Sequence, residues 1–159
     1  MSIRSTAKAL ILKDGKILFN KCNDMYHGEY YSLPGGGQHQ YETLPEALVR
    51  ECLEETGYTV IPIRFAALCE EICMDEGFRR NYPDYAHKMY HIFICELLDV
   101  EQKQPTEKDD MQVGCKWVEL NSLKNCYILP KIFNENINGI ISNTVPIFLG
   151  SEYIEYNHG

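Results

Sequence analysis

Three glutamates in this 159-residue chain have the type and spacing that a divalent cation requires. Glu51, Glu54 and Glu55 lie three and four positions apart, so on an α-helix their side chains share an arc of about 100°. Like charges at these spacings repel by about a few tenths of a kcal/mol per pair. A hard cation such as Mg²⁺ prefers oxygen ligands and would remove that repulsion. A solvated acidic helix face is the alternative for these three residues alone, so the surrounding sequence must decide.

A longer pattern surrounds the glutamates. It runs from Gly36 to Tyr58 and has the form G-x5-E-x7-R-E-U-x-E-E-x-G-U, where U is a bulky apolar residue. All of its fixed identities are present, and a chance match has a probability on the order of 10⁻⁹ per window at typical residue frequencies. The pattern resembles the box of the Nudix (MutT-like) hydrolases. The match is partial only at variable positions, where Cys52 replaces an aliphatic residue and His39 and Tyr41 replace a glutamate and a glycine.

The resemblance implies a magnesium site, in which Mn²⁺ can substitute. Glu51, Glu54 and Glu55 would bind the metal, or one of them would act as the base for the attacking water. Glu51 is our first choice for that base. The carbonyl oxygen of Gly35 would supply a further metal ligand from the glycine segment.

The resemblance also assigns residues around the metal site. Arg50 would pair with Glu42 and hold the glycine segment against the helix, which places it with the catalytic residues. Some family members complete the metal shell with an acid from a later loop, and the candidates here are Glu107, Asp109 and Asp110. An ordinary solvated polar loop is the alternative for these three residues.

The reaction implied by the resemblance is Mg²⁺-dependent hydrolysis of a phosphoanhydride bond in a nucleoside diphosphate linked to another moiety. Nucleoside triphosphates, nucleotide sugars and ADP-ribose all remain open as substrates. A fold does not determine a function, so a non-catalytic module that senses a nucleotide on the same fold is the alternative. Hydrolysis of capped RNA ends is disfavoured, because a formal net charge of -8 offers no basic stripe for extended nucleic acid.

Candidate substrate-binding residues lie outside the pattern. Residues 76–88 concentrate cations and aromatic side chains in an otherwise acidic chain. Arg79 and Arg80 are expected to bind phosphate, and neighbouring aromatic rings are suited to stack on a base. Tyr31, at a position where the family often has tryptophan, is also a substrate-binding candidate. An ordinary exposed loop or a dimer contact is the alternative for this segment.

The helix that positions the glutamates has clear ends. Thr43 and Glu46 form the pattern of a capping box, and Pro45 is tolerated in a first turn. Gly57 is a typical residue after a helix C-terminus. The sequence therefore predicts a helix over residues 43–56. On its wheel, Arg50 and Glu46 are expected to form an ion pair. The face expected to be buried contains Pro45, Leu48, Val49, Cys52, Leu53 and Thr56.

Other elements follow from apolar runs and turn residues. Asp14 and Gly15 predict a tight turn between strands at 7–12 and 17–19, followed by a polar loop at 23–32. The three glycines at 35–37 are expected to form no regular element. Further strands are expected at 59–68, 88–98, 112–119 and 145–149, a second helix at 130–141, and polar stretches at 74–86 and 99–111. This order predicts one α/β domain over residues 1–159, with the α/β/α sandwich around a mixed sheet that the resemblance implies.

Composition excludes several classes of protein. Hydrophobic residues make up 45% and charged residues 24%, which is typical of a globular domain. No apolar run approaches the roughly 18 residues of a membrane span, and the N-terminus is too polar for a secretory signal. The seven cysteines include no C-x-x-C pair and are expected to be buried in a reducing cytoplasm. The expected partner is a small nucleotide-derived substrate, and a homodimer is permitted.

Overall fold

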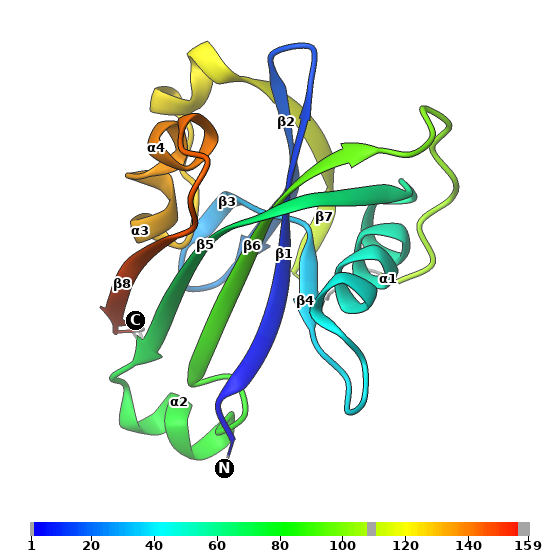
Figure 1. Ribbon diagram of the computed structural model, residues 1–159. Helices are drawn as coiled ribbons and strands as arrows, with labels where there is room; N and C mark the ends of the chain where they lie inside the picture. Colours follow the sequence, from blue (N-terminus) through cyan, green and yellow to red (C-terminus); the bar gives the residue numbers. More distant parts are fainter. Residues whose placement is uncertain (1, 108–110, 156–159) are drawn as a thin grey trace.

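A mixed, eight-stranded sheet forms the centre of the computed structural model, which describes residues 2–107 and 111–155 (Figure 1). The strands are β1 (Arg4–Lys13), β2 (Lys16–Asp24), β3 (Gly28–Ser32), β4 (Gly35–Gly37), β5 (Val60–Cys73), β6 (His87–Leu97), β7 (Gln112–Glu119) and β8 (Ile147–Ile154). The helices are α1 (Leu44–Thr56), α2 (Glu76–Asn81), α3 (Lys131–Asn134) and α4 (Ile137–Ser142), with a 3-10 helix, η1 (Leu120–Asn125).

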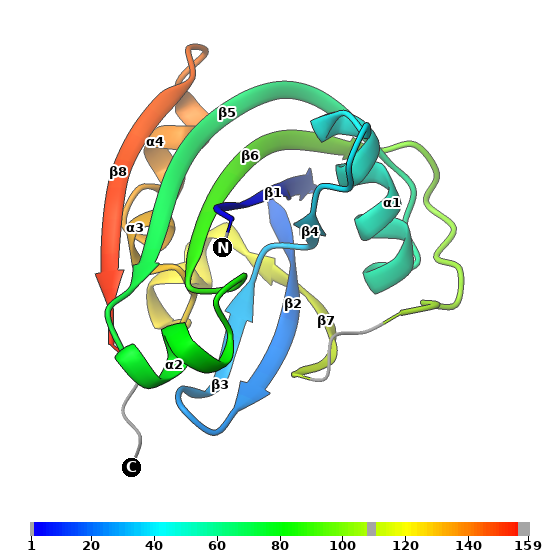
Figure 2. The same cartoon turned by 90° about the horizontal axis from the view of Figure 1, so that it is seen from below.

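The strand order is β3-β2-β1-β6-β5-β8, with β4 paired to β1 and β7 paired to β2. The β1–β6 and β5–β8 pairs are parallel, whereas the other pairs are antiparallel. Helix α1 lies on one side of the sheet, and α3 and α4 lie on the other (Figures 1 and 2). The predicted α/β class and mixed sheet are therefore confirmed.

Strand β1 separates two apolar clusters because its successive side chains point to opposite faces of the sheet. Ala7 and Ala9 pack in the cluster that contains Ala47 of α1. Leu10 packs in the other cluster, together with Phe133 of α3. Every one of these side chains is fully buried. Small residues on the first face let the helix approach the sheet closely.

The predicted hairpin and the predicted helix are both confirmed. Asp14 and Gly15 have φ of 50° and 73°, as a two-residue turn between antiparallel strands requires. Helix α1 has Thr43 as its N-cap, a complete capping box with Glu46, and Gly57 as its left-handed C-cap. Leu48, Cys52 and Thr56 are buried, Val49 and Leu53 are half-buried, and Pro45 is exposed.

The glycine segment corrects one expectation. Gly35, Gly36 and Gly37 form strand β4, which pairs with β1 in antiparallel register. The absence of side chains allows this pairing, because a Cβ at Gly35 would lie 2.0 Å from the carbonyl oxygen of Ala7. The loop expected at 23–32 likewise contains β3, which pairs with β2.

Three later elements also differ from expectation. The strand expected at 59–68 extends to Cys73, and the polar stretch after it contains α2. The helix expected at 130–141 is divided into α3 and α4, with Glu135 and Asn136 between them. The tail strand is longer than expected and forms β8, which pairs with Ala67–Cys73 of β5.

All seven cysteines are free, and five of them are buried. Burial raises the pKa of the Cys95 thiol to about 12, so this side chain behaves as a small apolar residue. Among residues 2–107 and 111–155, no helix has the length and apolar content to cross a membrane.

Candidate functional site

Glu55 joins three elements at the centre of the site. Its side chain is 5% exposed, because the last turn of α1 faces β2 and β4. Its Oε2 accepts a hydrogen bond of 2.8 Å from Asn20 Nδ2 and one of 2.9 Å from the Gly35 amide. Two donors on one oxygen compensate the desolvation of a buried carboxylate. The helix, β2 and the glycine strand are therefore held in one arrangement.

Glu51 lies directly against the glycine strand. A Cβ on Gly36 would be 2.6 Å from the carboxyl carbon of Glu51, so only glycine fits there without moving that carboxylate. Arg50 bonds Glu51 and Glu54 through the same nitrogen, Nη1, at 2.9 Å and 3.3 Å. Glu51 and Glu54 thus share one counterion.

Arg50 also binds the start of the helix and the glycine strand. Its guanidinium forms a two-point contact with Glu42, at 2.7 Å and 3.0 Å, and donates to the Gly37 carbonyl at 3.0 Å. The hydrogen bond from Arg50 lowers the pKa of Glu42 to about 2. The Arg50–Glu42 pair that the resemblance implied is present. The Arg50–Glu46 pair expected from the wheel is not, because the carboxylate of Glu46 bonds Thr43 in the capping box.

The donor atoms around the glycine strand fit Mg²⁺. They are the carboxylate oxygens of Glu51, Glu54 and Glu55 and the carbonyl oxygen of Gly35, all hard ligands. That carbonyl already accepts a cationic hydrogen bond of 2.6 Å from Lys8 Nζ. Within the described residues, no three acidic, histidine or cysteine side chains stand together as a ready metal cage. An ion would have to replace part of the contacts to cationic side chains.

The later loop, with three acidic candidates, docks on the end of α1. The backbone amides of Thr106 and Glu107 both donate to the Glu54 carbonyl at 3.0 Å. The Glu107 side chain is exposed. Asp109 and Asp110 lie outside the described residues, so their part in a metal shell stays a prediction.

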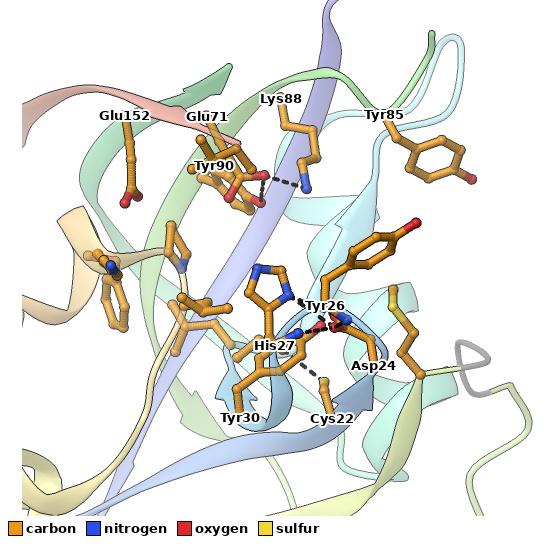
Figure 3. Close-up of a pocket in the computed structure, with 18 of the residues that line it drawn as sticks. Cys22, Asp24, Tyr26, His27, Tyr30, Glu71, Tyr85, Lys88, Tyr90 and Glu152 are labelled. Carbon is orange, nitrogen blue, oxygen red and sulfur yellow. Dashed lines mark hydrogen bonds and ion pairs between the residues drawn. The ribbon is translucent and has the colours of Figure 1, made fainter. Parts of the chain in front are cut away.

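A cavity of about 960 Å³ opens beside the glutamate helix. One end contains Glu55, Asn20 and Lys8, and the other contains Glu71 and Glu152. Figure 3 shows Lys88, Glu71, Tyr90 and Glu152 on one wall and Asp24, His27, Tyr30 and Cys22 on the facing wall. Its volume lies in the range of small-molecule sites.

The far end of the cavity is built by strand register. Glu71 of β5 pairs across the sheet with Lys88 of β6 on one side and Glu152 of β8 on the other. Its Oε1 bonds Lys88 Nζ at 2.6 Å and accepts from the Tyr90 hydroxyl at 3.3 Å. Burial raises the pKa of Glu152, whose carboxylate accepts one long bond of 3.4 Å from the Ile132 amide.

The predicted substrate-binding residues Arg79, Arg80 and Tyr31 do not line this cavity, and their part in substrate binding stays a prediction. Arg79 bonds the carbonyl of Cys73 and the sulfur of Met74, and Arg80 is exposed. Phe78 of the same helix lines the cavity instead, since neighbours in sequence point to different sides of a helix, and so do Tyr82 and Tyr85 after the helix ends. Tyr31 packs against Phe19, with ring centroids 5.9 Å apart, and does not line the cavity.

Several site residues were missed from the sequence. Gln112 donates to Asn20 Oδ1 at 3.2 Å and to the Glu55 carbonyl at 3.1 Å. Its own Oε1 is buried without a hydrogen-bond partner among the described residues. The sequence indicated Lys8 and Asn20 only weakly as site residues, because each is a polar residue in an apolar strand. It did not indicate Arg4, which lies 4.6 Å from the ring centroid of Tyr85.

Comparison with known proteins agrees with this geometry. A family model described as the NUDIX domain matches residues 3–138. A search of curated proteins finds no match. A UDP-X diphosphatase structure is 19% identical with a TM-score of 0.66, over 96% of this chain and 68% of the other. An ADP-ribose pyrophosphatase from Streptococcus suis is 20% identical with a TM-score of 0.63, over 95% and 100%.

A MutT protein from Bacillus halodurans has a TM-score of 0.69 at 14% identity, over 96% of this chain and 91% of the other. At these identities the structures establish a shared fold. The family model covers most of the chain and includes the complete pattern around the three glutamates. The chain belongs to the Nudix family of hydrolases.

Proposed function

We propose that the protein is a Mg²⁺-dependent hydrolase that cuts a phosphoanhydride bond in a nucleoside diphosphate linked to another moiety. The observation that carries this proposal is the position of Glu55 at the end of a large cavity, beside Glu51, Glu54 and the glycine strand. A phosphate group at that end would meet the carboxylate of Glu55 and the ammonium group of Lys8. The rest of the cavity offers room and aromatic rings for a nucleoside.

The residues divide the chemical work. A bound divalent metal would polarise the pyrophosphate and lower the pKa of a coordinated water. Glu51, Glu54, Glu55 and the Gly35 carbonyl would hold the metal, and Glu51 is our first choice as the base that takes the proton of the attacking water. Arg50 keeps the helix and glycine strand together through its contacts with Glu42 and Gly37.

The substrate class can be identified by a screen of nucleoside triphosphates, nucleotide sugars and ADP-ribose with Mg²⁺ or Mn²⁺. Released phosphate is read after a coupled phosphatase. We expect turnover of at least one class, loss of turnover in EDTA, and recovery when metal is returned. Full turnover in EDTA would refute the proposal. Tight nucleotide binding without turnover of any substrate would favour the sensing module instead.

We also propose that the protein forms a homodimer. Val145 and Phe148 are exposed at the β8 end of the molecule, which supports a homodimer through that region. Light scattering at several protein concentrations would test it, and a constant monomer mass would refute it.

A cytoplasmic location is proposed from the composition and the free cysteines, and cell fractionation would test it.

A further inference from the structure

Lys8 donates a hydrogen bond to an oxygen atom that the proposed metal would need as a ligand. Its Nζ donates to the Gly35 carbonyl oxygen at 2.6 Å, in a partly buried position beside Glu55 and Asn20 in the cavity wall. The carbonyl oxygen has two lone pairs, and a divalent ion on the second would lie within a few ångströms of the ammonium group on the first. The two cations would also repel one another strongly at a few ångströms.

The backbone register brings Lys8 to this position. Residue 8 of β1 pairs directly with Gly35 of β4, and its side chain lies on the same face of the strand as Leu10. That face is the cavity side of the sheet. The flexible four-carbon chain of lysine allows the ammonium group to move several ångströms while the strand stays in place.

Over the described residues, Lys8, Arg4 and Lys131 are cations of the cavity lining that form no ion pair, and of these Lys8 is the one bonded to the Gly35 carbonyl. Lys88 forms an ion pair of 2.6 Å with Glu71, and Arg50 is bound to Glu42. Over residues 2–107 and 111–155, no carboxylate lies within ion-pair distance of Lys8. Within the described residues its hydrogen-bond partner is the carbonyl of Gly35, which is a weaker partner than a phosphate oxygen.

We propose that Lys8 is an exchangeable counterion of the active site. It holds the Gly35 carbonyl in the metal-free protein, leaves that oxygen when a divalent metal binds, and then donates to a phosphate oxygen of the substrate. The inference rests on the proposed function, because it requires both a metal and a phosphate. It adds that one side chain couples metal loading to substrate binding.

The two halves of this role have opposite signs, which makes them separable. In the absence of substrate, Lys8 competes with the metal, so removal of its charge should strengthen metal binding. In the presence of substrate, Lys8 contributes a charged hydrogen bond, so the same change should weaken substrate binding. A lysine that merely stabilises the fold would move neither quantity in this way.

The first experiment compares Lys8→Met with Lys21→Met. Lys21 is an exposed lysine of β2 that does not line the cavity. Its substitution by methionine changes the net charge by the same amount as Lys8→Met. Calorimetric titration with Mn²⁺ alone should give a Kd about tenfold lower for Lys8→Met than for Lys21→Met. With substrate, KM of Lys8→Met should rise by about tenfold to a hundredfold. Equal Mn²⁺ affinity of the two variants, or an unchanged KM, would overturn the proposal.

The second experiment uses the unaltered protein, so it does not depend on how the variants fold. With ¹⁵N-labelled lysine, the ammonium resonance of Lys8 should shift on addition of Mg²⁺, and that of Lys21 should not. A Lys8 resonance that Mg²⁺ leaves unchanged, in protein shown by calorimetry to bind metal, would reject the role of Lys8 while the hydrolase proposal stands. Absence of any metal binding would reject both.

Discussion

The two ends of the cavity both present carboxylates, but in different states. At the α1 end, Glu55 is compensated by Asn20 and the Gly35 amide, and its neighbours share Arg50. At the β5–β8 end, burial raises the pKa of Glu152, and Glu71 lies opposite it in the neighbouring strand. At the first end each of these three carboxylates has a partner, although Gln112 Oε1 is buried without one among the described residues. The second carries a half-buried acid, Glu152, which accepts a long hydrogen bond of 3.4 Å from the Ile132 amide.

The two ends differ because they arise from different features of the sequence. The α1 end comes largely from one contiguous pattern, to which Asn20 of β2 and Gln112 of β7 add contacts with Glu55. The β5–β8 end comes from the pairing of strands far apart in the chain, in which Glu71 and Glu152 are 81 positions apart. We therefore expect chemistry to depend on the first end and substrate preference on the second.

Substitution of one glutamate at each end should give the largest contrast. Glu55→Gln should lower kcat by about 10²–10⁴-fold, because the site loses a charged ligand or base. Glu152→Gln should leave kcat nearly unchanged and alter KM by less than about tenfold. Initial rates on the best substrate from the screen, at saturating Mg²⁺, measure both. Similar losses of kcat in the two variants would remove the distinction.

The close contact between the glycine strand and the helix can be tested with a single methyl group. Gly36→Ala places a Cβ 2.6 Å from the carboxyl carbon of Glu51, so that carboxylate must move. A displacement of about 1 Å in a reacting group costs on the order of a hundredfold in rate. Gly139→Ala is the matched control, since nothing lies within 4 Å of its new Cβ. Wild-type activity of Gly36→Ala would show that the position of Glu51 is not critical.

The Arg50–Glu42 contact should contribute to stability in a pH-dependent manner. The pKa of Glu42 is lowered to about 2, so its charged form stabilises the fold above the unfolded pKa and loses that effect as pH falls toward 2. Glu42→Gln should therefore cost about 1–2 kcal/mol at pH 7, after allowance for solvent screening, and much less at pH 2.5. Urea unfolding at both pH values measures this, with the exposed Glu96→Gln as control. A pH-independent loss would point to packing instead.

At the β5–β8 end, we expect the pH dependence of stability to have the opposite sign. This is the smallest of the predicted effects. Because burial raises the pKa of Glu152, its ionisation opposes folding, and that cost grows as pH rises through the folded pKa. Glu152→Gln should raise the unfolding free energy by about a few tenths of a kcal/mol at pH 7.5, and the gain should vanish at pH 4. Thermal unfolding at the two pH values would detect it. A destabilised variant at pH 7.5 would indicate a partner that Glu152 needs.

The sequence predicts α1, its caps and the β1–β2 hairpin well, because each depends on local chemistry. Thr43 and Glu46 satisfy each other, and Asp14 and Gly15 adopt the turn that their backbones favour. The family pattern also identifies the glutamates that lie beside the glycine strand. These features need no knowledge of distant contacts.

Other features depend on long-range register, and the sequence gives little sign of them. Strand β4 consists of glycines, which provide no side-chain alternation, so its pairing with β1 leaves no pattern to detect. Arg79 and Arg80 have suitable chemistry for phosphate, but their helix turns them from the cavity. Gln112 meets Asn20 and Glu55 only because β7 lies beside β2.

Three alanines at the contact between α1 and the sheet affect the reaction indirectly. Ala7, Ala9 and Ala47 are fully buried between the sheet and the helix, so the bulk of these side chains determines how far the helix stands from β1. A larger residue at any of these positions would move Glu51, Glu54 and Glu55 together away from the glycine strand. We expect this uncharged seam, remote from any substrate, to tolerate less change than much of the cavity wall.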